Sequence, residues 1–191
     1  YKKNLELLTR NHVYSKEMEH DACGVGLIAS TEGKKSRAIV EYGIEALKAV
    51  WHRGAVDADG KTGDGAGIHV EIPKDFFIEK IQVTGHDYDN SEICVGMIFL
   101  PRNDYSAQEN CKTIVESELT KNNFSIYGWR QVPVNPKVLG EKALQTMPEI
   151  IQVLFKSNDP YLLDKDLERK IYETRKRIEN KAFGEVVNLF D

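Results

Sequence analysis

The stretch that decides the fold is Asp21-Ala22-Cys23-Gly24-Val25-Gly26-Leu27-Ile28-Ala29. A thiol stands at the head of a short apolar run, and this run predicts a buried strand over residues 24–30. Glycines in a strand let a ligand or another segment approach the backbone closely. Because a thiolate is a strong nucleophile even at a small ionised fraction, Cys23 is a candidate nucleophile. The alternative is a small buried hydrophobe, which is the commoner role of a free cysteine.

Segments further along the chain favour the reactive thiol. His52-Arg53-Gly54-Ala55, Thr62-Gly63-Asp64-Gly65-Ala66-Gly67 and Ile72-Pro73-Lys74-Asp75-Phe76-Phe77 follow in order and at tight spacing. Each piece is a weak signal alone, but the ordered set is a strong one. Together with the stretch around Cys23, these motifs make residues 19–77 resemble the start of the glutamine amidotransferase domain of glutamate synthase large chains. A looser resemblance extends to about residue 180.

This resemblance implies an α+β fold, the four-layer αββα sandwich of N-terminal-nucleophile hydrolases. It also implies a division into a leader over residues 1–22 and the amidotransferase domain over 23–191, incomplete at its C-terminal end. The chain begins at Tyr1 and stops without an obvious closing element, so we expect a piece of a longer protein. Strands followed by helices, taken alone, indicate only stacked sheet and helix layers.

Hydrophobic periodicity predicts the individual elements. The expected helices cover about 37–50 (with Ser36 as N-cap), a short segment from Pro73, 104–122, and a last segment from Asp164. The expected strands, besides 24–30, cover 68–72, 93–100, 124–132 and 150–155. The unbroken apolar run 93–100 predicts a strand buried on both faces, which makes Cys94 inert core; Cys111 falls on the apolar face of the helix 104–122.

Residues 52–67 are rich in glycine and predict a loop. A loop ending in Gly-Asp-Gly-Ala-Gly raises the possibility of phosphate binding. A P-loop, however, needs Gly-Lys-Ser/Thr opening a helix, whereas residues 68–72 alternate as a strand. We therefore expect a structural loop that lines the thiol pocket.

In the family that the chain resembles, the cysteine becomes the first residue of the mature chain. This implies that Cys23 attacks the glutamine side-chain amide and that its freed α-amine, with a pKa near 7.7–8.0, serves as base and then acid. Arg53 is implied to order the nucleophile and the pocket, which suits a planar, permanently charged group; a surface ion pair is the alternative. His52 would be the base of a Cys–His dyad if the amine were not.

Composition limits partners and cofactors. The net charge is −4 and charges of both signs are scattered along the chain, so the sequence shows no charged patch typical of nucleic-acid or membrane binding. No apolar run is long enough for a membrane span or a signal peptide. Three widely spaced cysteines argue against disulfides or zinc and for a reducing cytoplasm, and the five histidines have no metal-ligand spacing. We expect no metal and no cofactor in this segment. The resemblance places FMN, an iron–sulfur cluster and an NADPH-oxidising flavin subunit elsewhere in a longer enzyme.

The implied function is the glutaminase half-reaction of glutamate synthase, with ammonia passed through the protein to 2-oxoglutarate. Two alternatives stay open: a non-catalytic assembly or regulatory module of the same fold, and a class II amidotransferase with another acceptor. The family's Asn-Gly oxyanion hole has no convincing match, because Asn122-Asn123 and Asn158-Asp159 differ from it. Most substrate-binding residues are therefore expected beyond residue 191, and this segment alone should be incomplete as an enzyme.

Overall fold

The structure is a computed structural model, and it describes residues 3, 6, 24–51, 56–63 and 65–188, with side chains described as far as Phe183. The chain forms two compact units. Unit 1 comprises Tyr1–Ala55 and Asp64–Ile68, and unit 2 comprises Val56–Gly63 and His69–Asp191.

Unit 1 contains the helix α2, Arg37–Ala49, which confirms the helix predicted there. Ser36 occupies the N-cap position in extended backbone, but its side chain makes no cap hydrogen bond. The strand predicted over 24–30 is wrong for the structure: these residues have no regular secondary structure, and Val25 and Leu27 are 94% and 89% exposed. An apolar alternation becomes a strand only beside a partner strand, and the described part of unit 1 supplies none. The strand predicted over 68–72 is also wrong for the structure, because these residues have no regular secondary structure and join no strand of the sheet.

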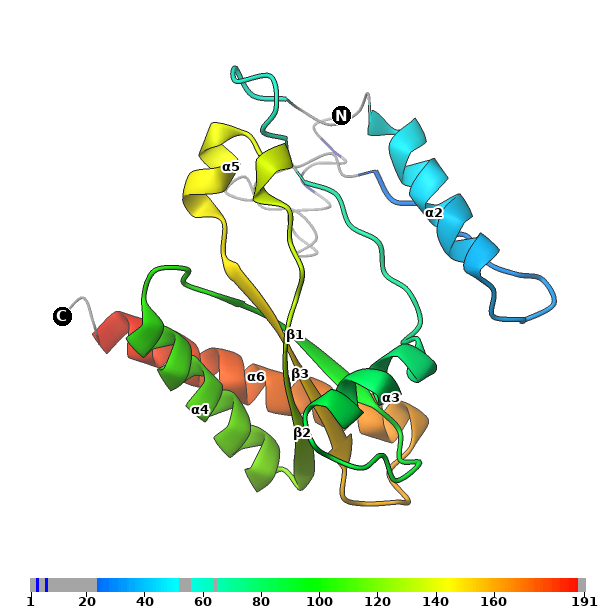
Figure 1. Cartoon of the computed structure of the whole chain (residues 1–191), viewed down its shortest axis with the longest axis vertical. Helices are drawn as coiled ribbons and strands as arrows, with labels where there is room; N and C mark the ends of the chain where they lie inside the picture. Colours follow the sequence, from blue (N-terminus) through cyan, green and yellow to red (C-terminus); the bar gives the residue numbers. More distant parts are fainter. Residues whose placement is uncertain (1–2, 4–5, 7–23, 52–55, 64, 189–191) are drawn as a thin grey trace. The chain divides into compact units, whose positions relative to one another are not determined.

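Unit 2 is built around a three-stranded antiparallel sheet with the order β1-β3-β2 (Figure 1). The strands are β1, Cys94–Leu100, β2, Phe124–Gln131, and β3, Glu149–Ser157. The helices are α3, Lys74–Val83, α4, Tyr105–Lys121, α5, Glu141–Thr146, and α6, Asp164–Asn188, with a short 3₁₀ turn at Pro136–Val138. The strands predicted at 124–132 and 150–155 and the helices predicted at 104–122 and from Asp164 are confirmed within a residue or two.

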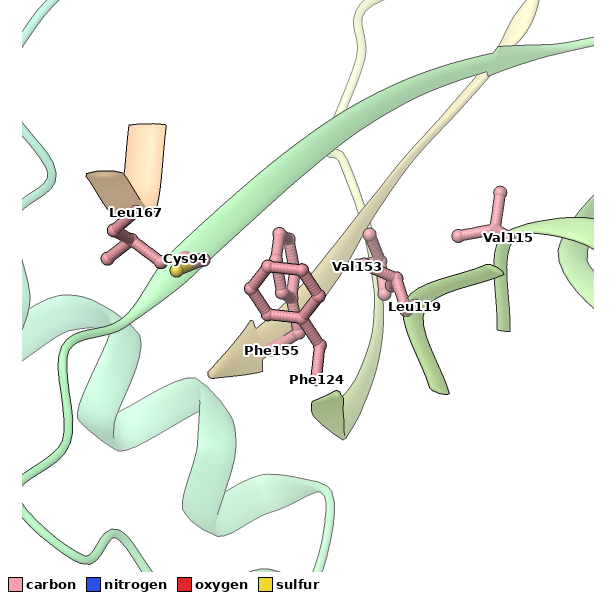
Figure 2. Packing of buried hydrophobic residues seen from close by; sticks show 7 residues of the cluster. All are labelled: Cys94, Val115, Leu119, Phe124, Val153, Phe155 and Leu167. Carbon is pink, nitrogen blue, oxygen red and sulfur yellow. The ribbon is translucent and has the colours of Figure 1, made fainter. Parts of the chain in front are cut away.

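The central strand β3 is buried from Ile151 to Phe155 because helices cover both faces of the sheet. Alternate residues point to opposite faces. Val153 and Phe155 join the cluster under α4 and α6, whereas Leu154 joins the cluster under α3. Figure 2 shows the first cluster, whose members are Cys94, Val115, Leu119, Phe124, Val153, Phe155 and Leu167. The second contains Phe77, Ile81, Ile93, Tyr127 and Leu154.

The strand β1 differs from its prediction. It lies at an edge of the sheet, and Met97 and Phe99 are 50% and 63% exposed, so the strand is not buried on both faces. Val95, Met97 and Phe99 alternate along one face of β1. The helix α3 covers only the end of this face near Val95, which joins the α3 cluster, and the apolar sequence does not show how far the helix extends. The α+β class is confirmed by one antiparallel sheet with helices on both faces, and the second sheet of the expected sandwich is not among the described residues.

Candidate active-site region

The three residues to which the sequence assigned chemistry, Cys23, His52 and Arg53, lie outside the described residues. Their roles therefore stay predictions. The structure does describe residues 56–63, here called loop 56–63, which begins three residues after Arg53 and leads into the Asp64-Gly65 part of the glycine-rich motif. This loop can be built from its residues upward.

Loop 56–63 closes on itself as a tight turn. Val56 and Gly63 form an antiparallel bridge, and the Asp57 backbone N–H donates to the Thr62 carbonyl at 2.7 Å. The Gly60 backbone N–H then donates to the Asp57 carbonyl at 2.9 Å. Gly60 has a φ of 67°, a left-handed conformation that glycine adopts without the penalty a side chain would incur. The glycine-rich sequence thus specifies a defined turn here, in agreement with the predicted loop.

The Asp59 carboxylate organises this turn. Its Oδ1 accepts hydrogen bonds from the backbone N–H groups of Lys61 at 2.9 Å and Thr62 at 2.7 Å. Its Oδ2 accepts one from the Thr62 hydroxyl at 2.5 Å. The Thr62 hydroxyl and the two backbone N–H groups hold the pKa of the Asp59 carboxyl well below its usual range. Asp59 is therefore ionised throughout the neutral range.

The same carboxylate fastens the turn to the start of α5. Asp59 Oδ2 also accepts from the Glu141 backbone N–H at 3.0 Å, which compensates for the N-cap residue Gly140 having no side chain to cap the helix. Beside it, the Lys142 ammonium donates to Asp57 at 2.5 Å. The Asp59–Glu141 contact and the Asp57–Lys142 pair therefore join segments more than eighty residues apart in the sequence.

The region does not fit two other kinds of site. No helix follows the glycine-rich motif at residues 65–72, as a P-loop would require. Asp57 and Asp59 both face N–H, O–H or ammonium donors, which is the reverse of what a bound cation would need. Across the described ranges, no group of three or more His, Cys, Asp or Glu side chains is placed to hold a metal ion.

Of the chain's three cysteines, Cys94 is confirmed as core. It is 5% exposed in the cluster under α4 and α6, and burial, followed by the charges of Glu92 and Glu168, raises the pKa of its thiol to about 12. A thiol held neutral in this way neither attacks an amide nor joins the set of thiolates that an iron–sulfur cluster requires. Cys111 is only half-buried, so its predicted place in the core is met in part.

The comparisons with known proteins identify the family. The model of the family described as glutamine amidotransferases class-II matches residues 23–188. This match covers most of the chain, and the chain therefore belongs to the class II glutamine amidotransferases. Membership confirms the predicted fold class, an α+β domain of the N-terminal-nucleophile hydrolase type.

Within that family the chain is similar to glutamate synthases. It is 52% identical over 190 residues to the glutamate synthase [NADPH] large chain of Azospirillum brasilense, which covers 100% of this chain and 12% of that protein. It is 40% identical over 168 residues to ferredoxin-dependent glutamate synthase 1, chloroplastic/mitochondrial, of Arabidopsis thaliana, covering 87% of this chain and 10% of that protein. The spinach ferredoxin-dependent enzyme is 40% identical over 166 residues. The chain spans about a tenth of the length of these relatives.

The contact between loop 56–63 and the start of α5 was not predicted from the sequence. The spacing Asp57-Ala58-Asp59-Gly60 does contain a local signal, since aspartates commonly bind backbone N–H groups two residues further on in turns. Nothing local in the sequence points to Gly140 as the residue against which the turn packs.

Proposed function

We propose that this chain is the glutaminase part of a glutamate synthase and that Cys23 is its nucleophile. The observation that supports this best is the family match, which begins at Cys23 itself. The 52% identity to a glutamate synthase large chain supports the choice of that enzyme within the family. The burial of Cys94 supports Cys23 by disfavouring one of the other two thiols.

The proposed reaction balances as glutamine plus water giving glutamate plus ammonia. The Cys23 thiol passes its proton to the α-amine as its sulfur bonds to the side-chain amide carbon. The carbon–nitrogen bond of the resulting tetrahedral intermediate breaks, and the protonated amine returns the proton to the departing nitrogen, which leaves as ammonia. Water then attacks the thioester, releasing glutamate and restoring the thiol. Tethering the base to the nucleophile makes a separately positioned histidine unnecessary.

Two further residues or segments belong to the proposal. Arg53 orders the free amine and the nucleophile, and its permanent positive charge favours the thiolate. Residues 1–22 are a leader and 23–191 belong to the amidotransferase domain, because an amine on Cys23 requires cleavage before it. The start of the family match at residue 23 supports that boundary.

The rest of the reaction belongs to a longer protein. Ammonia would reach a distant site where 2-oxoglutarate is aminated, and FMN, an iron–sulfur cluster and an NADPH-linked flavin subunit would supply electrons there. Within the described ranges no helix is both long and apolar enough to cross a membrane. We place the protein in the cytoplasm because three cysteines, an odd number without close spacing, suit a reducing compartment.

Turnover of glutamine by the intact protein and by its Cys23→Ala variant tests the proposal. The variant should lose glutaminase activity and glutamine-dependent glutamate synthesis, while ammonia-dependent synthesis survives because the acceptor site is elsewhere. Persistent glutamine-dependent turnover would show that Cys23 is not the nucleophile. Wild-type protein with no glutaminase activity would favour the non-catalytic module, and glutaminase activity without 2-oxoglutarate amination would favour another acceptor.

A further inference from the structure

We infer that Asp59 is a positioning residue for the glutaminase reaction, because its carboxylate anchors loop 56–63 to Gly140 and Glu141 at the start of α5. This inference rests on the proposed function. It concerns a residue that has no role in the proposed chemistry, since Asp59 neither attacks the amide nor transfers a proton. Its contribution would be to fix loop 56–63, which follows Arg53 in the sequence.

The anchor depends on hydrogen bonds rather than on apolar packing. Val56, Ala58 and Gly60 are exposed, so burial contributes little to fixing the loop. The Asp59 carboxylate instead accepts three hydrogen bonds from within the turn and one from the Glu141 backbone N–H. Removing the carboxylate leaves the Glu141 N–H without its acceptor. The turn is then held to α5 by the largely solvent-exposed Asp57–Lys142 ion pair, and ion pairs of this kind contribute little.

Gly140 forms the other half of the anchor. It is buried, and a Cβ added there would lie 2.4 Å from Asp59 Oδ2 and 2.5 Å from the Thr62 backbone nitrogen. Contacts this short with backbone cannot be relieved by rotating a side chain. Because the φ of Gly140 is −73°, an alanine would fit the local backbone without strain. A Gly140→Ala substitution therefore forces loop 56–63 and the start of α5 apart.

Covalent connection links this anchor to the reaction. Loop 56–63 is joined by one peptide bond to the segment that carries Arg53, three residues before Val56, and three residues of chain span at most about 10 Å. Fixing Val56 therefore restricts where the Arg53 backbone can go. A displacement of about 1 Å at a reacting group can reduce turnover by about 10²-fold, so kcat should be sensitive to the anchor.

A purely structural role, in which Asp59 only caps α5, is the alternative. The two roles differ in what they change. A cap contributes to folding and would affect every activity of the protein alike. A positioning role affects glutamine turnover specifically, and it changes kcat more than KM, because Arg53 is proposed to order the nucleophile rather than to bind substrate.

Kinetics on the intact protein that carries this chain separate these roles. The variants are Asp59→Ala, Asp59→Asn and Gly140→Ala, with Asp87→Asn as the matched control, since Asp87 is exposed and has no hydrogen bond or ion pair with any described residue. Asparagine keeps one acceptor oxygen but presents N–H donors where the second oxygen was. The readouts are kcat and KM for glutamine, the rate of inactivation by the glutamine analogue 6-diazo-5-oxo-L-norleucine, and ammonia-dependent glutamate synthesis.

We expect Asp59→Ala and Gly140→Ala to lower kcat for glutamine, and the inactivation rate, at least 10-fold, with KM changed less than threefold and ammonia-dependent synthesis kept within twofold. Asp59→Asn should be intermediate, and Asp87→Asn should equal wild type. Glutamine kcat within twofold of wild type in both Asp59→Ala and Gly140→Ala would overturn the inference, as would an equal loss of ammonia-dependent synthesis. If those variants are unaffected while Cys23→Ala is inactive, only this inference fails; if Cys23→Ala keeps its glutaminase activity, the proposed function fails.

Discussion

Gly128 in β2 faces Thr84 at the end of α3 so closely that a Cβ on the glycine would lie 2.7 Å from Thr84 Cγ2 and 2.9 Å from its Cβ. The pairing of β2 with β3 is irregular between Ile126 and Gly128, and Gly128 has a φ of 146°, which L side chains rarely adopt. The Thr84 hydroxyl lies 2.7 Å from the carbonyl of Tyr127, to which it donates. The irregularity in the strand thus provides the close contact that fixes α3 on the sheet.

Replacing Gly128 by alanine should destabilise unit 2 by about 2–6 kcal/mol, because strained backbone and overlap with Thr84 each cost about 1–3 kcal/mol. Hydrogen exchange of β2 and α3 peptides in the intact protein measures the change as faster local opening. Gly85→Ala is the matched control: its φ is 83°, but a Cβ there meets nothing within 4 Å, so only the backbone cost of about 1–2 kcal/mol applies. Equal effects at the two glycines would show that the contact with Thr84 is unimportant.

A buried carboxylate joins α4 to α6. Glu118 is 4% exposed and accepts from the ammonium groups of Lys181, on α6, and of Lys121, one turn along α4. The Lys181 hydrogen bond is the main cause that lowers the pKa of Glu118, and the pKa of Lys181 is raised in return. We expect Glu118→Ala to cost about 1–3 kcal/mol, since hydrogen bonds to charged groups contribute about that much.

The loss should be local to the second half of α6. Hydrogen exchange of peptides covering residues 175–183 should speed up in Glu118→Ala, while peptides around Leu167 change little because that end of the helix packs in the apolar cluster. Lys112→Ala is the control, because Lys112 pairs with the exposed Glu109 within α4 and does not reach α6. Unchanged exchange at residues 175–183 in Glu118→Ala would mean that the ion pairs do not fasten α6.

The loop before β1 carries a pH-dependent contact. The Asp89 carboxylate accepts from the Lys156 ammonium, and from the Tyr127 hydroxyl at 2.8 Å. Lys156, and next the Ser91 contact, hold the pKa of Asp89 well below its usual range, whereas burial, and next Asp89, raise the pKa of Tyr127 above its usual range. The two shifts affect opposite ends of the pH scale.

The folded state binds the Asp89 proton more weakly than the unfolded chain does, so this stabilisation is complete above about pH 5 and is lost as the pH falls below about 4. It should amount to about 1 kcal/mol or less, because the Asp89 side chain is 45% exposed and solvent screens the pair. The folded state holds the Tyr127 proton more tightly, so that stabilisation is complete below about pH 10 and is lost above it. Asp89→Asn should remove the acidic dependence and Tyr127→Phe the alkaline one.

Hydrogen exchange of residues 84–92 measures both effects. The quantity to compare is the logarithm of the exchange rate, variant minus wild type at each pH, because the intrinsic exchange rate cancels in this difference. The Asp89→Asn difference should shrink as the pH is lowered from 5 to 3. The Tyr127→Phe difference should shrink as the pH is raised from 9 to 11. If the differences of both variants from wild type stayed constant with pH, the Asp89 and Tyr127 contacts would have no role in the pH dependence of stability.

How much of the fold and of the candidate site can be predicted from the sequence depends on how far apart in the sequence the interacting residues lie. The helix predicted over 104–122 runs from Tyr105 to Lys121, and its N-cap is local as well, because the Asp104 carboxylate accepts from the Ala107 backbone N–H three residues further on. The strand Glu149–Ser157 is predicted equally well, because a central strand covered on both faces is mostly apolar and only Gln152 interrupts the apolar run 150–155. Local patterns of this kind predicted stacked sheet and helix layers, and the α+β sandwich was predicted from the family resemblance.

The sequence could not show what lies beside each segment. The runs 93–100 and 24–30 look alike in composition, yet one pairs with β3 and the other has no strand partner within the described part of unit 1. The Asp59–Glu141 contact spans more than eighty residues and depends on Gly140, which any local pattern assigns to an ordinary turn. The assignment of Cys23 came from the resemblance and not from periodicity, because the chemistry of a thiol depends on its surroundings.

Thiol reactivity should separate the cysteines. With burial raising its pKa to about 12, Cys94 would have a thiolate fraction of about 10⁻⁴ at pH 8. We expect 6-diazo-5-oxo-L-norleucine to label Cys23 and to leave Cys94 and Cys111 unmodified, with glutamine protecting in proportion to its occupancy. Peptide mapping after labelling locates the adduct. An adduct mainly on Cys94 or Cys111 would contradict the nucleophile assignment.

Residues 1–22 are proposed to be a leader that is removed from the active protein. In the sequence as it stands the Cys23 nitrogen is part of a peptide bond to Ala22, and its lone pair is delocalised into the carbonyl, so it cannot act as a base near neutral pH. We therefore expect cleavage between Ala22 and Cys23 to be the activating step, and the intact mass of purified, active protein should lack residues 1–22. A Cys23→Ser variant is a useful comparison, because a hydroxyl at this position could still attack the preceding carbonyl, though more slowly than the thiol. Active protein that retains Tyr1–Ala22 would contradict both the cleavage and the amine base, and would make His52 the residue to test next as the base.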